Sequence, residues 1–84
     1  MSQTFHLEAL GFSQTGKPTP VVQRQTLRAE AVEGVERRAV RLLQRSRSPQ
    51  WSLAPVEAVR IVDGSGVELF RWTLWDEMSG ARPG

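Results

Sequence analysis

Cysteine is absent from this chain of 84 residues, which excludes disulfide bonds, thiolate nucleophiles and zinc sites built on sulfur. His6 is the only histidine, so a metal site made of several histidines is excluded as well. No apolar run approaches the roughly 18 residues that a transmembrane helix requires. The first residues have neither the basic nor the apolar part of a secretory signal. We therefore expect a cytoplasmic protein with no membrane contact, no metal and no cofactor.

Lysine occurs once, as Lys17, and asparagine is absent, whereas the chain contains ten arginines. This bias is typical of a GC-rich bacterial genome or of its phages, and it carries no mechanism. The formal net charge is only +2. The positions of the arginines therefore matter more for function than the overall charge does.

The length limits the chain to one domain. Alternating apolar residues predict strands over residues 4–12 and 21–27, and apolar residues three and four apart predict a helix over 29–46. A second hairpin is predicted from strands at 56–62 and 67–75 around a turn at 63–66. We therefore expect an α+β fold: a single ββαββ domain over residues 1–75, with one helix packed on one face of an antiparallel sheet, and a disordered C-terminal tail over 76–84.

No set of residues in the sequence resembles a catalytic site. The segment from Gly11 to Lys17 nearly matches the phosphate-binding loop, but Pro18 stands where that loop needs a hydroxyl for magnesium. His6 has Glu8 on the same predicted strand face, without a nucleophile placed to work with either. We therefore expect a protein that is not an enzyme and takes no small-molecule substrate.

The predicted helix carries the first candidate binding surface. Five arginines and no acidic residue lie between residues 37 and 47, and on a helical wheel Arg38, Arg41 and Arg45 align along one edge with Arg37 nearby. Three interpretations stay open: a solvated face ordered by the helix dipole, a stripe that binds phosphates, and a surface for an acidic protein. Three glutamates in the first half of the same helix count against nucleic acid.

The second candidate surface is the sheet face that a single helix leaves uncovered. The predicted pairing of the last two strands places Arg60, Leu69, Arg71 and Trp75 on that face. Exposed tryptophan beside arginine is typical of an interface hot spot. The alternatives are that the loop around Trp51 covers part of this face, and that two copies of the chain pair through the sheet.

The closing hairpin with its Asp63-Gly64-Ser65-Gly66 turn follows a helix rich in alanine, glutamate and arginine. This layout resembles small bacterial hairpin-helix-hairpin proteins of unknown function and compact phage-encoded anti-defence proteins, some anti-CRISPR proteins among them. The resemblance implies a non-catalytic binder that blocks or bridges a larger host protein or ribonucleoprotein, and it assigns no functional residue.

We therefore predict a protein-interaction module, with a phage or mobile-element inhibitor that occludes a host complex as its specific form. The alternative is a small nucleic-acid-binding protein that uses the same arginines on phosphates, and a homodimer is the third hypothesis. The predicted partner-binding residues are Arg37, Arg38, Arg41, Arg45, Arg60, Leu69, Arg71 and Trp75.

Overall fold

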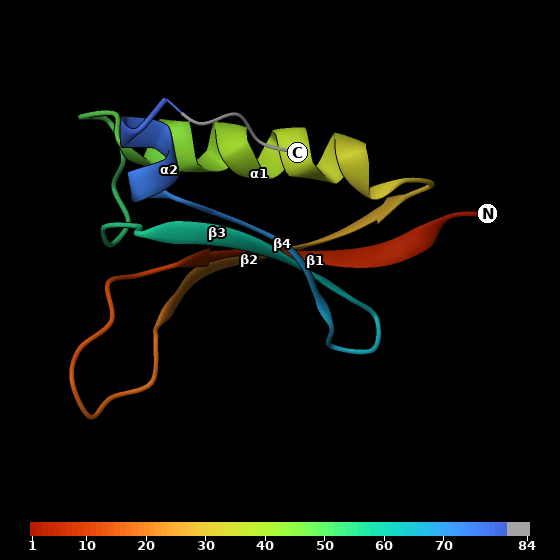
Figure 1. The fold of residues 1–84 in the computed structure, drawn as a ribbon, viewed down its shortest axis with the longest axis horizontal. Helices are drawn as coiled ribbons and strands as arrows, with labels where there is room; N and C mark the ends of the chain where they lie inside the picture. Colours follow the sequence, from red (N-terminus) through yellow and green to blue (C-terminus); the bar gives the residue numbers. More distant parts are fainter. Residues whose placement is uncertain (81–84) are drawn as a thin grey trace.

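The computed structural model describes residues 1–80 and contains one four-stranded sheet with a long helix packed on one of its faces (Figure 1). Along the chain the elements are β1 (Gln3–Leu10), β2 (Val21–Ala29), α1 (Val32–Ser46), β3 (Ala58–Asp63), β4 (Glu68–Thr73) and α2 (Leu74–Met78). The strand order is β2-β1-β3-β4, and all neighbouring strands are antiparallel. The expected α+β class, with an antiparallel sheet and one main helix on it, is confirmed.

The core lies between α1 and the two central strands. Residues on alternate positions of β1 point toward the helix, and the register sets Leu7 opposite Ile61 and Ala9 opposite Val59. The helix presents its apolar stripe to this layer, including Ala39. The largest side chains that are fully buried come from all three elements: Phe5, Leu7, Leu43, Val59 and Ile61.

The turn between β3 and β4 is held by its first residue. The Asp63 carboxylate accepts hydrogen bonds from the backbone N–H groups of Ser65 (2.9 Å) and Val67 (3.0 Å). Gly66 has a φ of 90°, in the region that favours glycine. The bond from Val67, followed by bonds from Ser65, lowers the pKa of Asp63 below its ordinary value, although its partial desolvation opposes this. The predicted hairpin is therefore confirmed together with its turn.

The last strand is shorter than predicted, because Thr73 begins a helix. The Thr73 hydroxyl accepts a hydrogen bond from the Asp76 N–H (3.2 Å), and the Asp76 carboxylate accepts one from the Thr73 N–H (2.8 Å). This capping box starts α2. The prediction of a strand to residue 75 is wrong for that reason, and Trp75 lies on α2. The predicted disordered tail is also wrong for residues 76–80, which form the rest of α2 and a turn, while residues 81–84 lie outside the described part.

The short helix α2 lies beside the second half of α1, on the same side of the sheet (Figure 1). Glu77 joins them, because its carboxylate accepts hydrogen bonds from Trp72 Nε1 (2.8 Å) and Gln44 Nε2 (3.3 Å). Arg47 Nη1 lies 3.7 Å from the same carboxylate. One flank of α1 is therefore occupied by α2, whereas the opposite flank faces the edge strand β2.

Candidate functional site

The sheet face opposite α1 carries a row of ion pairs across all four strands. Glu8 on β1 lies at its centre, with Arg24 Nε of β2 at 3.2 Å and Arg60 Nε of β3 at 2.7 Å. Arg60 also lies 3.6 Å from Glu68 on β4, and Glu68 pairs with Arg71 at 2.7 Å. Two of the predicted partner-binding residues, Arg60 and Arg71, are therefore already neutralised by carboxylates.

The two carboxylates of this row have different surroundings. Glu8 is the only charged residue that is buried among the described ones, with a side chain 10% exposed, and it lies 52 positions before Arg60 in the chain. Glu68 is more open, and the hydrogen bond from Arg71, supported by the charges of Arg71 and Arg60, lowers its pKa below the ordinary value against a smaller opposing effect of desolvation. Arg24, Arg60 and Arg71 therefore complete a structural network on this face.

The other two residues predicted on this face are separated from each other. Leu69 lies on β4 next to the register shift that sets Val62 opposite Glu68, and it is 44% exposed. Trp75 is 65% exposed on α2, which lies on the helix side of the sheet (Figure 1). Arg60, Leu69, Arg71 and Trp75 thus do not form one continuous surface, because the chain turns into α2 after Thr73.

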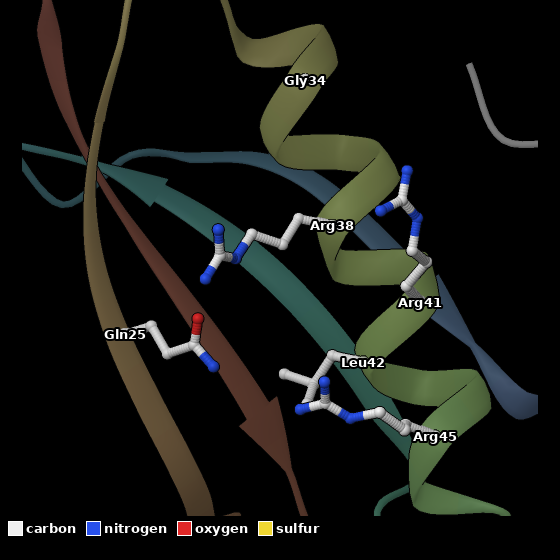
Figure 2. Close-up of a pocket in the computed structure, with 6 residues that line it drawn as sticks. All are labelled: Gln25, Gly34, Arg38, Arg41, Leu42 and Arg45. Atoms are coloured by element: carbon white, nitrogen blue, oxygen red, sulfur yellow. The ribbon is translucent and has the colours of Figure 1, made fainter.

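The predicted arginines of the helix, in contrast, largely come together. Arg38, Arg41 and Arg45 line a groove of about 310 Å³ between α1 and β2, with Leu42 and Gln25. Figure 2 shows Arg38 and Arg45 reaching toward β2 and Gln25 reaching toward the helix, while Arg41 extends along the helix surface. We call this the arginine groove; its lining residues are Gln25, Gly34, Arg38, Arg41, Leu42 and Arg45. Arg37 is exposed and lies outside this lining.

The period of the helix explains why these arginines share one flank. At about 100° per residue, Arg38, Arg41 and Arg45 fall within one narrow sector beside the buried stripe. Glu36 lies about 160° around the helix from Arg38 by the same count, on the flank of α2. The glutamates of α1 are therefore absent from the lining of the groove, which contains no acidic residue.

Charge in the arginine groove is unbalanced. Within residues 1–80, Arg38, Arg41 and Arg45 form no ion pair, whereas Arg24, Arg60 and Arg71 of the opposite sheet face each have a carboxylate partner. Arg47 is paired with Glu77, while Arg28 and Arg37 form no ion pair among the same residues. Guanidinium groups bind carboxylates and phosphates in a planar, two-pronged geometry. The groove therefore presents three guanidinium groups without a carboxylate partner in residues 1–80, which is the chemistry that binds anionic groups.

Gln25 is a groove residue that the sequence analysis missed. The register places Gln23, Gln25 and Leu27 on the helix side of β2, opposite Ala9, Leu7 and Phe5. The two glutamines indicate that the helix does not cover this part of β2, because a strand covered by a helix carries apolar residues at its inward positions. This pattern was present in the sequence and could have identified Gln25. The Gln23 Oε1 atom is buried without a hydrogen-bond partner in the described part of the chain.

Two further hollows adjoin the arginine groove, one at each end. The hollow toward the start of α1 is lined by residues 27–29 of β2 with Gly34, Val35 and Arg38. The hollow near the end of α1 lies between Arg45 and Trp51. An occupant longer than one anionic group could therefore extend along the direction of β2.

The one histidine lies away from this groove. His6 Nδ1 is 3.1 Å from the Thr26 hydroxyl, exposed on the sheet face opposite α1. Among residues 1–80, no group of three or more His, Cys, Asp and Glu side chains is arranged to hold a metal ion. The part of the chain described here also has no helix of the length and apolar character needed to cross a bilayer.

Comparison of the chain with protein-family models, with curated proteins and with solved structures finds no match in any of the three. Function must therefore be argued from the residues of the site.

Proposed function

We propose that this protein is a non-catalytic protein-interaction module that binds a carboxylate-bearing surface of a partner protein in the arginine groove. The observation that carries the proposal is the division of the arginines into two sets. Arg24, Arg60 and Arg71 on the open sheet face are paired with carboxylates, whereas Arg38, Arg41 and Arg45 converge on one groove without a partner in the described chain. Unpaired guanidinium groups beside a partly apolar wall match an acidic protein surface.

The lining of the groove favours protein over nucleic acid. Proteins that bind single strands stack the bases on several aromatic side chains, whereas the arginine groove contains none and the hollow next to Arg45 offers only Trp51. Leu42 and Gln25 instead supply an apolar contact and an amide, both of which suit a polypeptide. Binding of nucleic acid through the arginines on phosphates is the alternative that the experiment below addresses.

The predicted role of Trp75 changes with its position. Trp75 and Met78 form an exposed apolar pair on α2, which contacts the flank of α1 opposite the groove through Gln44 and Glu77. A partner seated in the arginine groove would reach Trp75 only by crossing α1. We therefore treat Trp75 as part of a separate surface. Occlusion of a host complex by a bacterial, phage or mobile-element inhibitor remains the specific form of the proposal, supported by the resemblance in layout alone.

The proposal is tested with simple probes that carry charge and no specific sequence. Fluorescence anisotropy measures binding of labelled heptaglutamate, its heptaglutamine counterpart and a single-stranded dT heptamer. Loss of two charge-assisted contacts in Arg38→Gln/Arg45→Gln should weaken heptaglutamate binding about tenfold or more. The matched control Lys17→Gln/Arg71→Gln removes the same charge from a loop and from the opposite sheet face, and should change affinity less than about twofold, since exposed distant charges are screened.

Four outcomes would contradict the proposal, the first being that heptaglutamate does not bind. Equal weakening by both double variants would mean that net charge and not the groove attracts the peptide. Equal binding of heptaglutamine would remove the role of carboxylates. Tighter binding of the dT heptamer than of heptaglutamate, lost in Arg38→Gln/Arg45→Gln, would establish the nucleic-acid alternative. Trp75→Ala should leave heptaglutamate binding unchanged.

A further inference from the structure

The strand that forms one wall of the arginine groove is also an edge of the sheet. β2 (Val21–Ala29) pairs with β1 on one side only, so its other side has no neighbouring strand in the described chain. In an antiparallel pair, alternate residues direct their N–H and C=O groups away from the partner strand. Over nine residues this edge offers such groups along about 30 Å. A free edge of this length is a template for an added strand.

Both faces of β2 carry positive charge near this edge. The register sets Arg24 opposite Glu8 and Arg28 opposite Thr4, which places both arginines on the open sheet face. On the other face, Arg38 and Arg45 reach toward β2 from α1 (Figure 2). β2 itself contains no acidic residue. The side chains of a strand added here would point alternately to the two faces of the sheet, and those on either face would lie near arginines.

Resting on the proposed function, we infer that the partner contributes an extended acidic segment that pairs with β2 as a fifth strand. Arg38 and Arg45 lie seven residues apart on α1, a rise of about 10 Å. Alternate side chains of a strand are about 6.6 Å apart, so two carboxylates on the helix side fit between these arginines. Side chains on the other side of the added strand would lie beside Arg28 and Arg24. The Arg24 side chain is 55% exposed although it is paired with Glu8.

A second copy of this chain does not fit the same edge. Pairing of β2 with β2 of another copy would bring Arg24 and Arg28 of both chains onto one face of the joined sheet. The groove arginines of both chains would lie on the other face. Like charges facing each other across strands oppose pairing. The occupant is therefore a different segment, dense in aspartate or glutamate and free of proline at the residues that donate to β2.

The inference is tested with heptaglutamate and a fully N-methylated heptaglutamate, which has the same charge and no backbone N–H donors. Their affinities are compared by anisotropy, and amide hydrogen exchange of β2 is followed by NMR with and without the unmodified peptide. A strand added to β2 requires the N–H donors, so the N-methylated peptide should bind at least about tenfold more weakly, a loss near 1.4 kcal/mol. Exchange of alternate amides along β2 should slow at least about tenfold in the complex, because these amides gain partners.

Two results separate the failure of this inference from the failure of the proposed function. If heptaglutamate binds and depends on Arg38 and Arg45, while the N-methylated peptide binds equally well and β2 amides exchange at unchanged rates, strand addition is refuted and the groove remains a charge-based site. If heptaglutamate does not bind, or binds independently of Arg38→Gln/Arg45→Gln, the proposed function is refuted and the inference with it. Slowed exchange at β1 and β3 but not at β2 would also refute strand addition.

Discussion

Replacing the buried carboxylate Glu8 by glutamine should destabilise the protein more than any other single change in the ion-pair row. Glu8→Gln keeps the size of the side chain and removes its charge, so the 2.7 Å contact with Arg60 loses its ionic character. A hydrogen bond between charged groups contributes about 1.5–3 kcal/mol. The Arg24 contact contributes less than about 1 kcal/mol, because that side chain is 55% exposed and screened by solvent. The expected loss in free energy of unfolding is therefore about 2–3 kcal/mol.

This loss is large for a domain of 84 residues. Proteins of this size have about 4–12 kcal/mol of total stability. The melting temperature should fall by about 10–20 °C, at 4–8 °C for each kcal/mol. Urea unfolding followed by tryptophan fluorescence is a suitable assay, since Trp72 is buried in the core. The midpoint should shift with no change in the dependence on urea.

A double-mutant cycle decides whether the ion pair is the cause. Glu8→Gln and Arg60→Gln should show a coupling energy of about 1.5–2 kcal/mol, while Arg24→Gln alone should cost less than about 1 kcal/mol. The reasoning is refuted if Glu8→Gln costs under about 0.5 kcal/mol, or if the coupling to Arg60 is near zero. In either case the burial of Glu8 would reflect packing of its aliphatic part, and the row across the sheet would contribute nothing.

Three further predictions follow from local geometry. Gly34→Ala should raise the free energy of unfolding by about 0.5–1 kcal/mol, because a Cβ there meets nothing closer than 3.8 Å and alanine is the better helix former; a loss in urea unfolding would contradict this. The lowered pKa of Glu68 means that its charged form stabilises the fold above pH 4.5 and that this contribution is lost as the pH falls through the lowered pKa. Urea unfolding at a series of acidic pH values should therefore show a weaker pH dependence for Glu68→Gln, and an unchanged slope would count against the Arg71 pairing. Thr73→Ala removes the capping box, so amides of α2 should exchange about fivefold faster, for a loss near 1 kcal/mol; unchanged exchange would show that the Glu77 contacts hold α2 alone.

The positions of the main elements were predictable because they depend on local patterns. Alternation of apolar residues identified β1, β2 and the closing hairpin, and the spacing of Val35, Ala39 and Leu42 identified α1. The arginine edge followed from the same helical period. The start of α2 was not predicted, although Thr73 and Asp76 have the spacing of a capping box. The alternation of apolar residues continues through Trp72 and Leu74, and it predicts a strand across the residues where α2 begins.

What the sequence by itself determined is therefore the set of elements and the face of each that is apolar, since both depend on residues a few positions apart. Which arginines are free was decided only by the tertiary structure. Glu8 and Arg60 lie 52 residues apart and meet because β1 pairs with both β2 and β3, which no local pattern specifies. The position of β2 at the sheet edge likewise leaves Gln25 opposite Arg38 and Arg45. Electrostatic pairing depends on distance in space, and strand order sets that distance.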